Sequence, residues 1–275
     1  MFMFGTILLF GLLTGIFLGI GGFLGGYLGA GLALILAFVI NFVAYWYSDK
    51  IVLRLYRAKP SQDKKLNEMV AKLSQEAKIP APRVFVVPSN TPNAFATGRT
   101  PKHAALAVTE GLSGLTEEEM EGVLSHELGH ITNRDILVST VAATLAGAIS
   151  YIAQIGYFSL YGRDERGAGN IIGLILIVVF APLAALMIRM AISRSREYRA
   201  DRYGAVLTKN PKGLASALRK ISAIAQQHPM EGGSNATSHL WIVNPFRGNA
   251  FTNMFSTHPP MEQRIRRLMA MEGAD

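Results

Sequence analysis

Residues 125–130 read Ser125-His126-Glu127-Leu128-Gly129-His130 and contain the pattern H-E-x-x-H. In a helix, His126 and His130 lie about one turn apart on the same face. Two imidazoles placed in this way can bind one Zn²⁺ ion, and the glutamate between them can act on a water molecule at that metal. The alternative interpretation is a buried helix with two incidental histidines.

The residues around this motif predict the helix independently. Thr116 and Glu119 form the pattern of a capping box, with Thr116 as the N-cap. Acidic side chains in the first turns suit the positive end of the helix dipole, and apolar residues then recur at helical spacing from Met120 to Leu128. The motif in this context favours a zinc protease over two incidental histidines.

The composition indicates that part of the chain lies in lipid. Half of the 275 residues are hydrophobic and only 17% are charged, against about 25% charged in an ordinary soluble domain. There is no cysteine, so a metal must be bound by histidine and carboxylate. The net charge of +8 could indicate nucleic-acid binding, but the basic residues cluster beside apolar segments, which instead favours a lipid bilayer as the partner and no nucleic acid.

Residues 1–48 carry no charged side chain. One helix of that length would reach roughly 70 Å, whereas the hydrocarbon core of a bilayer is ~30 Å thick. We therefore predict two spans, residues 4–20 and 28–46, with a turn at the glycines between them. Within the first span, a ridge of small residues would let the two helices approach closely; it consists of Gly11, Gly15 and Gly19.

The basic residues that follow the second span, from Lys50 to Lys65, predict its orientation. By the positive-inside rule this side is cytoplasmic, and two spans return the N-terminus there as well. Two further uncharged runs, residues 136–162 and 167–188, are long enough to span. The alternative for the first of them is a helical hairpin packed on the catalytic domain.

The polar segment before the zinc motif predicts a small sheet. An amphipathic helix is expected over residues 63–78, and strands are expected at 83–87 and 103–109. Between the strands lies Asn93-Ala94-Phe95-Ala96-Thr97-Gly98. This segment could present a sheet edge to which a substrate adds as a strand, or it could simply form a hairpin; from the residues alone the two are equal alternatives.

A second cluster of ionisable residues surrounds Glu197 and Asp201. These carboxylates are one helical turn apart on one face. A catalytic zinc site needs a third protein ligand, and no other downstream cluster offers a carboxylate so well framed. Asp201 could then orient a ligating imidazole. The alternative is a solvent-exposed helix in which neighbouring arginines pair with both carboxylates.

The end of the chain predicts a helix from Asn210 to about Gln227, a long loop over residues 228–257, and a last helix that follows His258. Taken alone, these residues favour a helix cap for His258 and a solvent-exposed charge for Arg264.

Together these observations predict a mainly α integral membrane protein, with helical hairpins in the membrane and a zincin-like α+β catalytic domain that has a small β-sheet. In chain order the predicted parts are an N-terminal transmembrane hairpin (1–48), the first part of the catalytic domain (49–135), a second hydrophobic hairpin (136–188) and the second part of the catalytic domain (189–275).

Four motifs together resemble the HtpX family of membrane-bound zinc metalloproteases, relatives of the CaaX prenyl protease. They are residues 126–130, 197–201, 93–98 and 257–260. Their order, and the hydrophobic pairs before and between them, are also similar to that family. Many zincins share the first motif, whereas the set of four is much more specific.

The resemblance implies that His126, His130 and Glu197 bind one Zn²⁺ and that Glu127 is the general base. It implies proteolytic quality control of misfolded or damaged membrane proteins. It also implies a multi-pass protein of the cell membrane, with the active site and both termini on the cytoplasmic side.

The resemblance further implies roles for residues outside the zinc motif. Asn93, Ala94 and Phe95 match the strand that lies beside the substrate. His258 and Arg264 match a late pair near the reaction centre, where they would act in catalysis.

A rival function is a catalytically silent membrane adaptor that keeps zinc for structure. Structural zinc sites are usually closed by four protein ligands, whereas only three are apparent here and Glu127 would be idle. A metal-handling transporter would carry ionisable residues inside its spans, and residues 1–48 have none.

Overall fold

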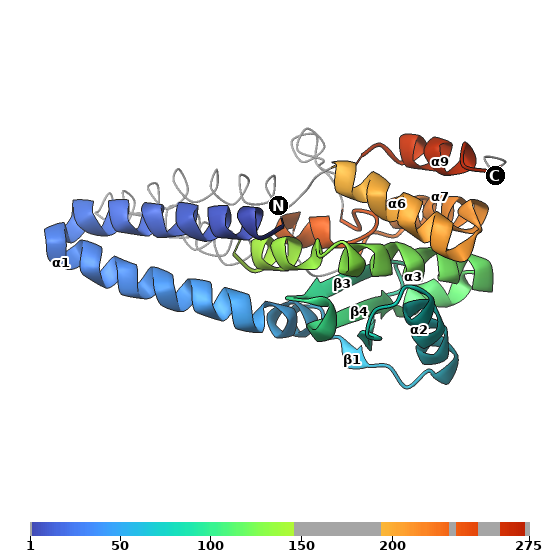
Figure 1. The fold of residues 1–275 in the computed structure, drawn as a ribbon, viewed down its shortest axis with the longest axis horizontal. Helices are drawn as coiled ribbons and strands as arrows, with labels where there is room; N and C mark the ends of the chain where they lie inside the picture. Colours follow the sequence, from blue (N-terminus) through green and yellow to red (C-terminus); the bar gives the residue numbers. More distant parts are fainter. Residues whose placement is uncertain (1, 146–193, 231–234, 247–258, 273–275) are drawn as a thin grey trace, which may run out of the picture.

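Helix α3 (Glu117–Thr132) lies at the centre of the folded part of the chain, between the small sheet and helices α6 and α7 (Figure 1). It begins with the predicted capping box. Glu119 N donates to Thr116 Oγ1 over 3.3 Å, and Thr116 N donates to a carboxylate oxygen of Glu119 over 2.9 Å. The helix is buried along most of its length, so packing on all sides fixes the positions of its side chains.

The computed structural model describes residues 2–145, 194–230, 235–246 and 259–272. In chain order its helices, strands and 3₁₀ helices (η) are α1 (Phe2–Leu55), β1 (Lys59–Pro60), α2 (Lys64–Glu76), β2 (Arg83–Val87), β3 (Ala94–Gly98), η1 (Pro101–His103), β4 (Ala104–Thr109), η2 (Glu110–Gly114), α3 (Glu117–Thr132), α6 (Arg194–Thr208), α7 (Pro211–Gln227), η3 (Asn235–Leu240) and α9 (Met261–Met269). A further helix, Ile136–Leu145, follows α3.

The sheet has the strand order β1-β2-β4-β3. Strands β2 and β4 are parallel, and β1 and β3 run antiparallel to their neighbours. The predicted strands at 83–87 and 103–109 are confirmed. The prediction missed β1, because two residues that include a proline carry no strand pattern. Strand β3 is therefore both one arm of the hairpin considered above and the edge strand next to α3.

Both faces of β3 and β4 are covered. Ala94, Ala96 and Leu106 belong to the core formed with α3, α7 and α9. The alternate residues of these strands, among them Phe95 and Ala107, belong to a second core with the end of α1. This arrangement follows from the two-residue period of a strand, and it explains why both strands are buried throughout.

The predicted helices at 63–78 and 210–227 are confirmed as α2 and α7. Each begins at a capping side chain, since Asp63 accepts from Leu66 N and Asn210 accepts from Gly213 N. The region predicted as one long loop contains the short helix η3, which its glycine- and asparagine-rich surroundings did not indicate.

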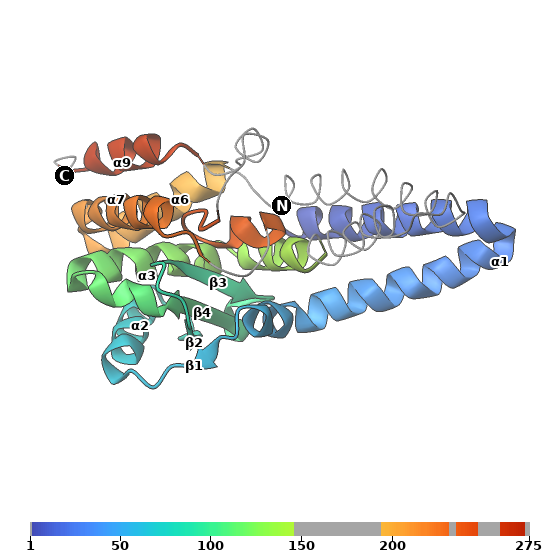
Figure 2. The same cartoon turned by 180° about the vertical axis from the view of Figure 1, so that it is seen from behind.

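Helix α1 folds back on itself as a hairpin (Figure 2). The reversal is at Gly25 and Gly26, and Gly26 has φ 58°, which favours glycine. The arms meet at Gly21 and Gly29, where a Cβ on either residue would collide with the other's backbone oxygen. The predicted ridge of Gly11, Gly15 and Gly19 is not where the described arms meet, because no described atom lies within 4 Å of a Cβ built there.

Within the described residues, Gly25–Leu55 is the one helix long and apolar enough to cross a membrane. The first arm, Ile7–Gly22, and the helix Ile136–Leu145 are apolar but shorter. The second arm stays helical past the predicted boundary at residue 48 and exposes large apolar side chains such as Leu28 and Phe38. Most of the second predicted hairpin, residues 136–188, lies outside the described residues.

The capping box also joins α3 to α7. The Glu119 carboxylate is buried and accepts from Ser216 Oγ over 2.6 Å and from Lys220 Nζ over 2.8 Å. Burial alone would raise the pKa of Glu119, but the hydrogen bonds from Lys220, Ser216 and Thr116 N outweigh it and hold the pKa below its usual value.

Replacing Glu119 by alanine is expected to lower the unfolding midpoint of the detergent-solubilised protein at pH 7 by roughly 5 °C, because about 2 kcal/mol of buried hydrogen bonding is lost. Since the pKa is depressed in the folded state, this contribution is present above the unfolded pKa and disappears as the pH falls through the folded value. The gap between wild type and variant should therefore shrink in acid. The exposed neighbour Glu118 provides the control as Glu118→Ala; equal midpoints for all three proteins at pH 7 would contradict this role.

Candidate metal centre and active site

Helices α3 and α6 pack unusually closely where the predicted ligands lie. A Cβ built at Gly204 of α6 would lie 3.0 Å from the backbone nitrogen of His126. One built at Gly129 of α3 would lie 3.3 Å from Cα of Ala200. Small residues on both helices therefore let the backbones approach, and this approach brings the side chain of Glu197 over the two histidines.

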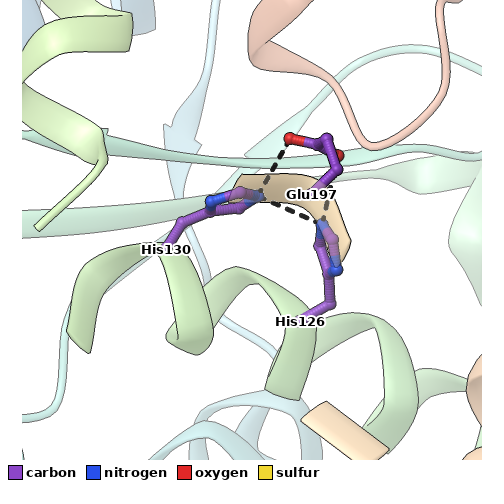
Figure 3. Close-up of side chains that lie close together, drawn as sticks. All are labelled: His126, His130 and Glu197. Atoms are coloured by element: carbon purple, nitrogen blue, oxygen red, sulfur yellow. Dashed lines mark hydrogen bonds and ion pairs between the residues drawn. The ribbon is translucent and has the colours of Figure 1, made fainter. Parts of the chain in front are cut away.

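The three predicted ligands point toward one another (Figure 3). His126 Nε2 and His130 Nε2 are 3.2 Å apart. Glu197 Oε1 lies 3.5 Å from His130 Nε2, and Glu197 Oε2 lies 3.9 Å from His126 Nε2. The structure thus brings together, from two helices, one donor atom of each residue within a sphere the size of a metal site.

These distances fit a zinc ion. Zn–N and Zn–O bonds of about 2.0–2.1 Å in tetrahedral geometry place any two ligand atoms about 3.3–3.4 Å apart. The two Nε2 atoms are 3.2 Å apart, and the two oxygens of Glu197 lie 3.5 and 3.9 Å from them, which is close to that value. Two imidazoles and a carboxylate without thiolate are also a usual catalytic zinc set, so the residues present fit the metal.

Asp201 fixes the ring of His126. Its Oδ1 lies 2.9 Å from His126 Nδ1, so a proton on Nδ1 leaves the lone pair on Nε2, toward the metal position. Burial lowers the pKa of His126, and the opposing effect of Asp201 does not restore it, so the ring is neutral as a ligand must be. Glu197 and Asp201 are both in the interior, not on a solvent-exposed helix.

Arg264 of α9 completes this arrangement. Its Nε and Nη2 lie 2.9 and 2.7 Å from the two carboxylate oxygens of Asp201, and its Nη1 donates to Ile242 O over 2.8 Å. Burial alone would raise the pKa of Asp201, but the charge of Arg264 outweighs it and lowers the pKa. The sequence alone favoured an exposed charge for Arg264, whereas its side chain is fully buried. His258 lies outside the described residues.

His130 has a carboxylate partner that the sequence analysis did not identify. Asp135 Oδ2 lies 3.4 Å from His130 Nδ1. Burial would lower the pKa of His130, but the hydrogen bond with Asp135 and the charges of Glu197 and Glu127 raise it to about 9. The surroundings therefore favour a positive charge at this ring, which a bound cation would supply instead of the proton.

Glu127 lines a cavity together with His130, Glu197 and Asp135. Burial raises its pKa to about 7, with the charge of His130 acting in the opposite direction. The other walls come from Ala96 of β3, from Ile136 and Ser139, and from residues 239–242 at the end of η3 and just beyond it. The carboxylate between the two histidines thus faces the same space as two of the three predicted ligands.

The three residues predicted to contact substrate hold one wall of this cavity. Asn93 Nδ2 donates to Val243 O over 2.7 Å, and Ala94 O accepts from Ile242 N over 3.1 Å. Phe95 packs edge-to-face on Trp241, with ring centroids 4.7 Å apart. All three are buried, so the structure places them behind residues 241–243.

Comparison with known proteins identifies the family. The model of "Peptidase family M48" matches residues 60–272, which is most of the chain. The chain belongs to peptidase family M48. The "Protease HtpX homolog" of Syntrophobacter fumaroxidans is 50% identical over 238 residues, covering 83% of this chain and 84% of the relative. That of Thermococcus kodakarensis is 52% identical over 234 residues, covering 82% and 81%. The resemblance to HtpX proteases drawn from the four motifs is therefore confirmed.

A solved structure shares the fold of this M48 peptidase. The crystal structure of S. mikatae Ste24p superposes with a TM-score of 0.51 at 19% sequence identity. The match covers 85% of this chain but only 57% of the Ste24p chain, so it speaks for the fold alone. Family membership and the His126, His130 and Glu197 cluster together support a metalloprotease.

Proposed function

We propose that this M48 peptidase is a membrane-anchored, zinc-dependent endopeptidase that cleaves misfolded or damaged membrane proteins. The observation that carries the proposal is the convergence of His126, His130 and Glu197 at zinc-ligand distances, with Glu127 facing the same cavity. Such a site requires one Zn²⁺ per chain. The substrate class rests on the likeness to HtpX proteases and on the apolar hairpin.

His126, His130 and Glu197 would hold the metal. The chemistry that Zn²⁺ supplies when bound is polarisation of the scissile carbonyl group and acidification of water. Glu127 is placed to take a proton from the attacking water and to pass it to the leaving nitrogen of the cleaved bond. Its burial in the cavity excludes bulk solvent from this proton transfer.

The remaining predicted residues act around this centre. The Arg264 guanidinium binds Asp201 and Ile242 O and lies 3.6 Å from Glu197 Oε2, so we propose that it acts by holding Asp201 against His126 and Glu197 beside the metal position. Asn93, Ala94 and Phe95 would shape the substrate site by fixing residues 241–243. The catalytic role of His258 stays a prediction.

A test of the chemistry compares Glu127→Gln with wild type. The variant keeps the volume and the metal ligands but cannot act as a base, so it should retain stoichiometric zinc while kcat for casein falls at least ~10²-fold. Chelation should abolish wild-type turnover, and added zinc should restore it. The exposed Glu118 on the same helix provides the control as Glu118→Gln, which should cleave normally. Unchanged turnover in Glu127→Gln, or in metal-stripped protein, would contradict the mechanism.

We propose that α1 anchors the protein, with the catalytic part and both termini on the cytoplasmic side. The support is the apolar helix Gly25–Leu55 and the basic residues in its last turns and just beyond it, at Lys50, Arg54 and Arg57. The turn at Gly26 lies at the end of the α1 hairpin that is far from the sheet (Figure 1). It would therefore face the side of the membrane opposite to the catalytic part.

Because the chain has no cysteine, single cysteines can test this topology. Tyr27 beside the turn is fully exposed, and Ala71 on α2 is exposed on the catalytic part. An impermeant maleimide should label Tyr27→Cys in intact cells and Ala71→Cys only after permeabilisation. Labelling of Ala71→Cys from outside would overturn the orientation, and failure to label Tyr27→Cys before permeabilisation would overturn the spanning hairpin.

A further inference from the structure

Each histidine of the metal centre has a carboxylate at its other ring nitrogen, and each of these carboxylates has an arginine. On one side the series is His126, Asp201 and Arg264. On the other side His130 Nδ1 lies 3.4 Å from Asp135 Oδ2, and Arg199 Nη2 lies 3.3 Å from Asp135 Oδ1. Asp135 lies outside the four motifs, and Arg199, although within residues 197–201, is not a predicted metal ligand.

The backbone after α3 is shaped to bring Asp135 to His130. The helix ends at Thr132, and Arg134 has φ 56°, in the left-handed region. This reversal lets the backbone nitrogen of Asp135 donate to His130 O over 2.9 Å. The side chain of Asp135 is then 2% exposed, so it faces the ring and not solvent. A buried carboxylate needs such partners, because an unpaired one would be costly.

The two series cross between the same two helices. Asp201 belongs to α6 and reaches His126 of α3. Asp135 follows α3 and reaches Arg199 of α6, two positions from the ligand Glu197. The two helices that carry the predicted ligands are therefore joined by a hydrogen bond, His126 to Asp201, and by an ion pair, Arg199 to Asp135.

We propose that Asp135 is a positioning residue that orients His130 for metal binding, and that Arg199 holds Asp135 in place. The proposal deepens the proposed function and rests on its zinc site. An acceptor at Nδ1 fixes the ring so that Nε2 offers its lone pair to the metal. Losing such a partner typically weakens metal affinity 10–100-fold.

The distances set the size of the expected effects. The contact of Asp135 with His130 is longer than that of Asp201 with His126, at 3.4 against 2.9 Å. We therefore expect Asp135→Asn to weaken zinc affinity by about 10-fold, the lower end of the range. The Arg199 side chain is 46% exposed, so solvent screens its charge. Arg199→Gln should therefore weaken zinc affinity only about 3-fold.

The test uses the full-length protein in detergent, stripped of metal and titrated with Zn²⁺ against a chromophoric chelator. Asp135→Asn should bind zinc about 10-fold more weakly than wild type. The visible spectrum of its Co²⁺ complex should differ from that of wild type, because the ring moves in the ligand field. The unfolding midpoint of the metal-free protein should stay within about 2 °C, the shift expected for less than 1 kcal/mol. Asp49→Asn is the matched control, since Asp49 pairs with Arg83 away from the centre; it should bind both metals as wild type does.

Wild-type zinc affinity together with a wild-type Co²⁺ spectrum in Asp135→Asn would overturn the proposal. If that variant does not fold, Arg199→Gln decides, and wild-type affinity in Arg199→Gln then overturns it. Because metal binding is measured without substrate, failure of this inference is distinct from failure of the proposed function. If the proposed function failed instead, the wild-type protein itself would not bind one zinc per chain.

Discussion

The close contact between α3 and α6 is the constraint on which the site depends. Neither helix has a complete set of metal ligands, since α3 provides two imidazoles and α6 provides one carboxylate. A side chain at Gly204 would press on the backbone of His126, and the resulting separation would take Glu197 away from both rings. The hydrogen bond between His126 and Asp201 and the ion pair between Arg199 and Asp135 also cross this contact, so both depend on the close approach of the two helices. The close packing of α3 and α6 is therefore a precondition for the ligand geometry.

The remaining elements support this helix pair from two directions. The capping box of α3 is completed by α7 through Ser216 and Lys220, which fixes where α3 begins. On the far side, the residue that follows α1 reaches the cavity wall through edge-to-face ring contacts. Tyr56 and Phe95 both contact Trp241, with centroids 4.9 and 4.7 Å away, and the Tyr56 hydroxyl bonds Thr237. The apolar hairpin is thus joined by direct packing to a wall of the catalytic cavity.

Local patterns predicted the elements that depend on local signals. The cap at Thr116, the helical spacing of His126 and His130, and the strand at 83–87 are each specified by neighbouring residues. The burial of Arg264 could not be predicted in this way, because its partner Asp201 lies on another helix 63 positions earlier. The contact of Asp135 with His130 could not be predicted either, because it requires a left-handed backbone at Arg134, for which a non-glycine residue gives no signal. The wall at residues 239–243 has no periodic pattern, and its position follows from Asn93 and Arg264.

Anomalous diffraction at the zinc absorption edge, from crystals of the full-length protein grown with one equivalent of Zn²⁺, tests the central claim most directly. The account predicts a single strong peak between His126 Nε2, His130 Nε2 and the Glu197 carboxylate, about 2 Å from each. A strong peak elsewhere in the molecule, with these three side chains unliganded, would contradict it.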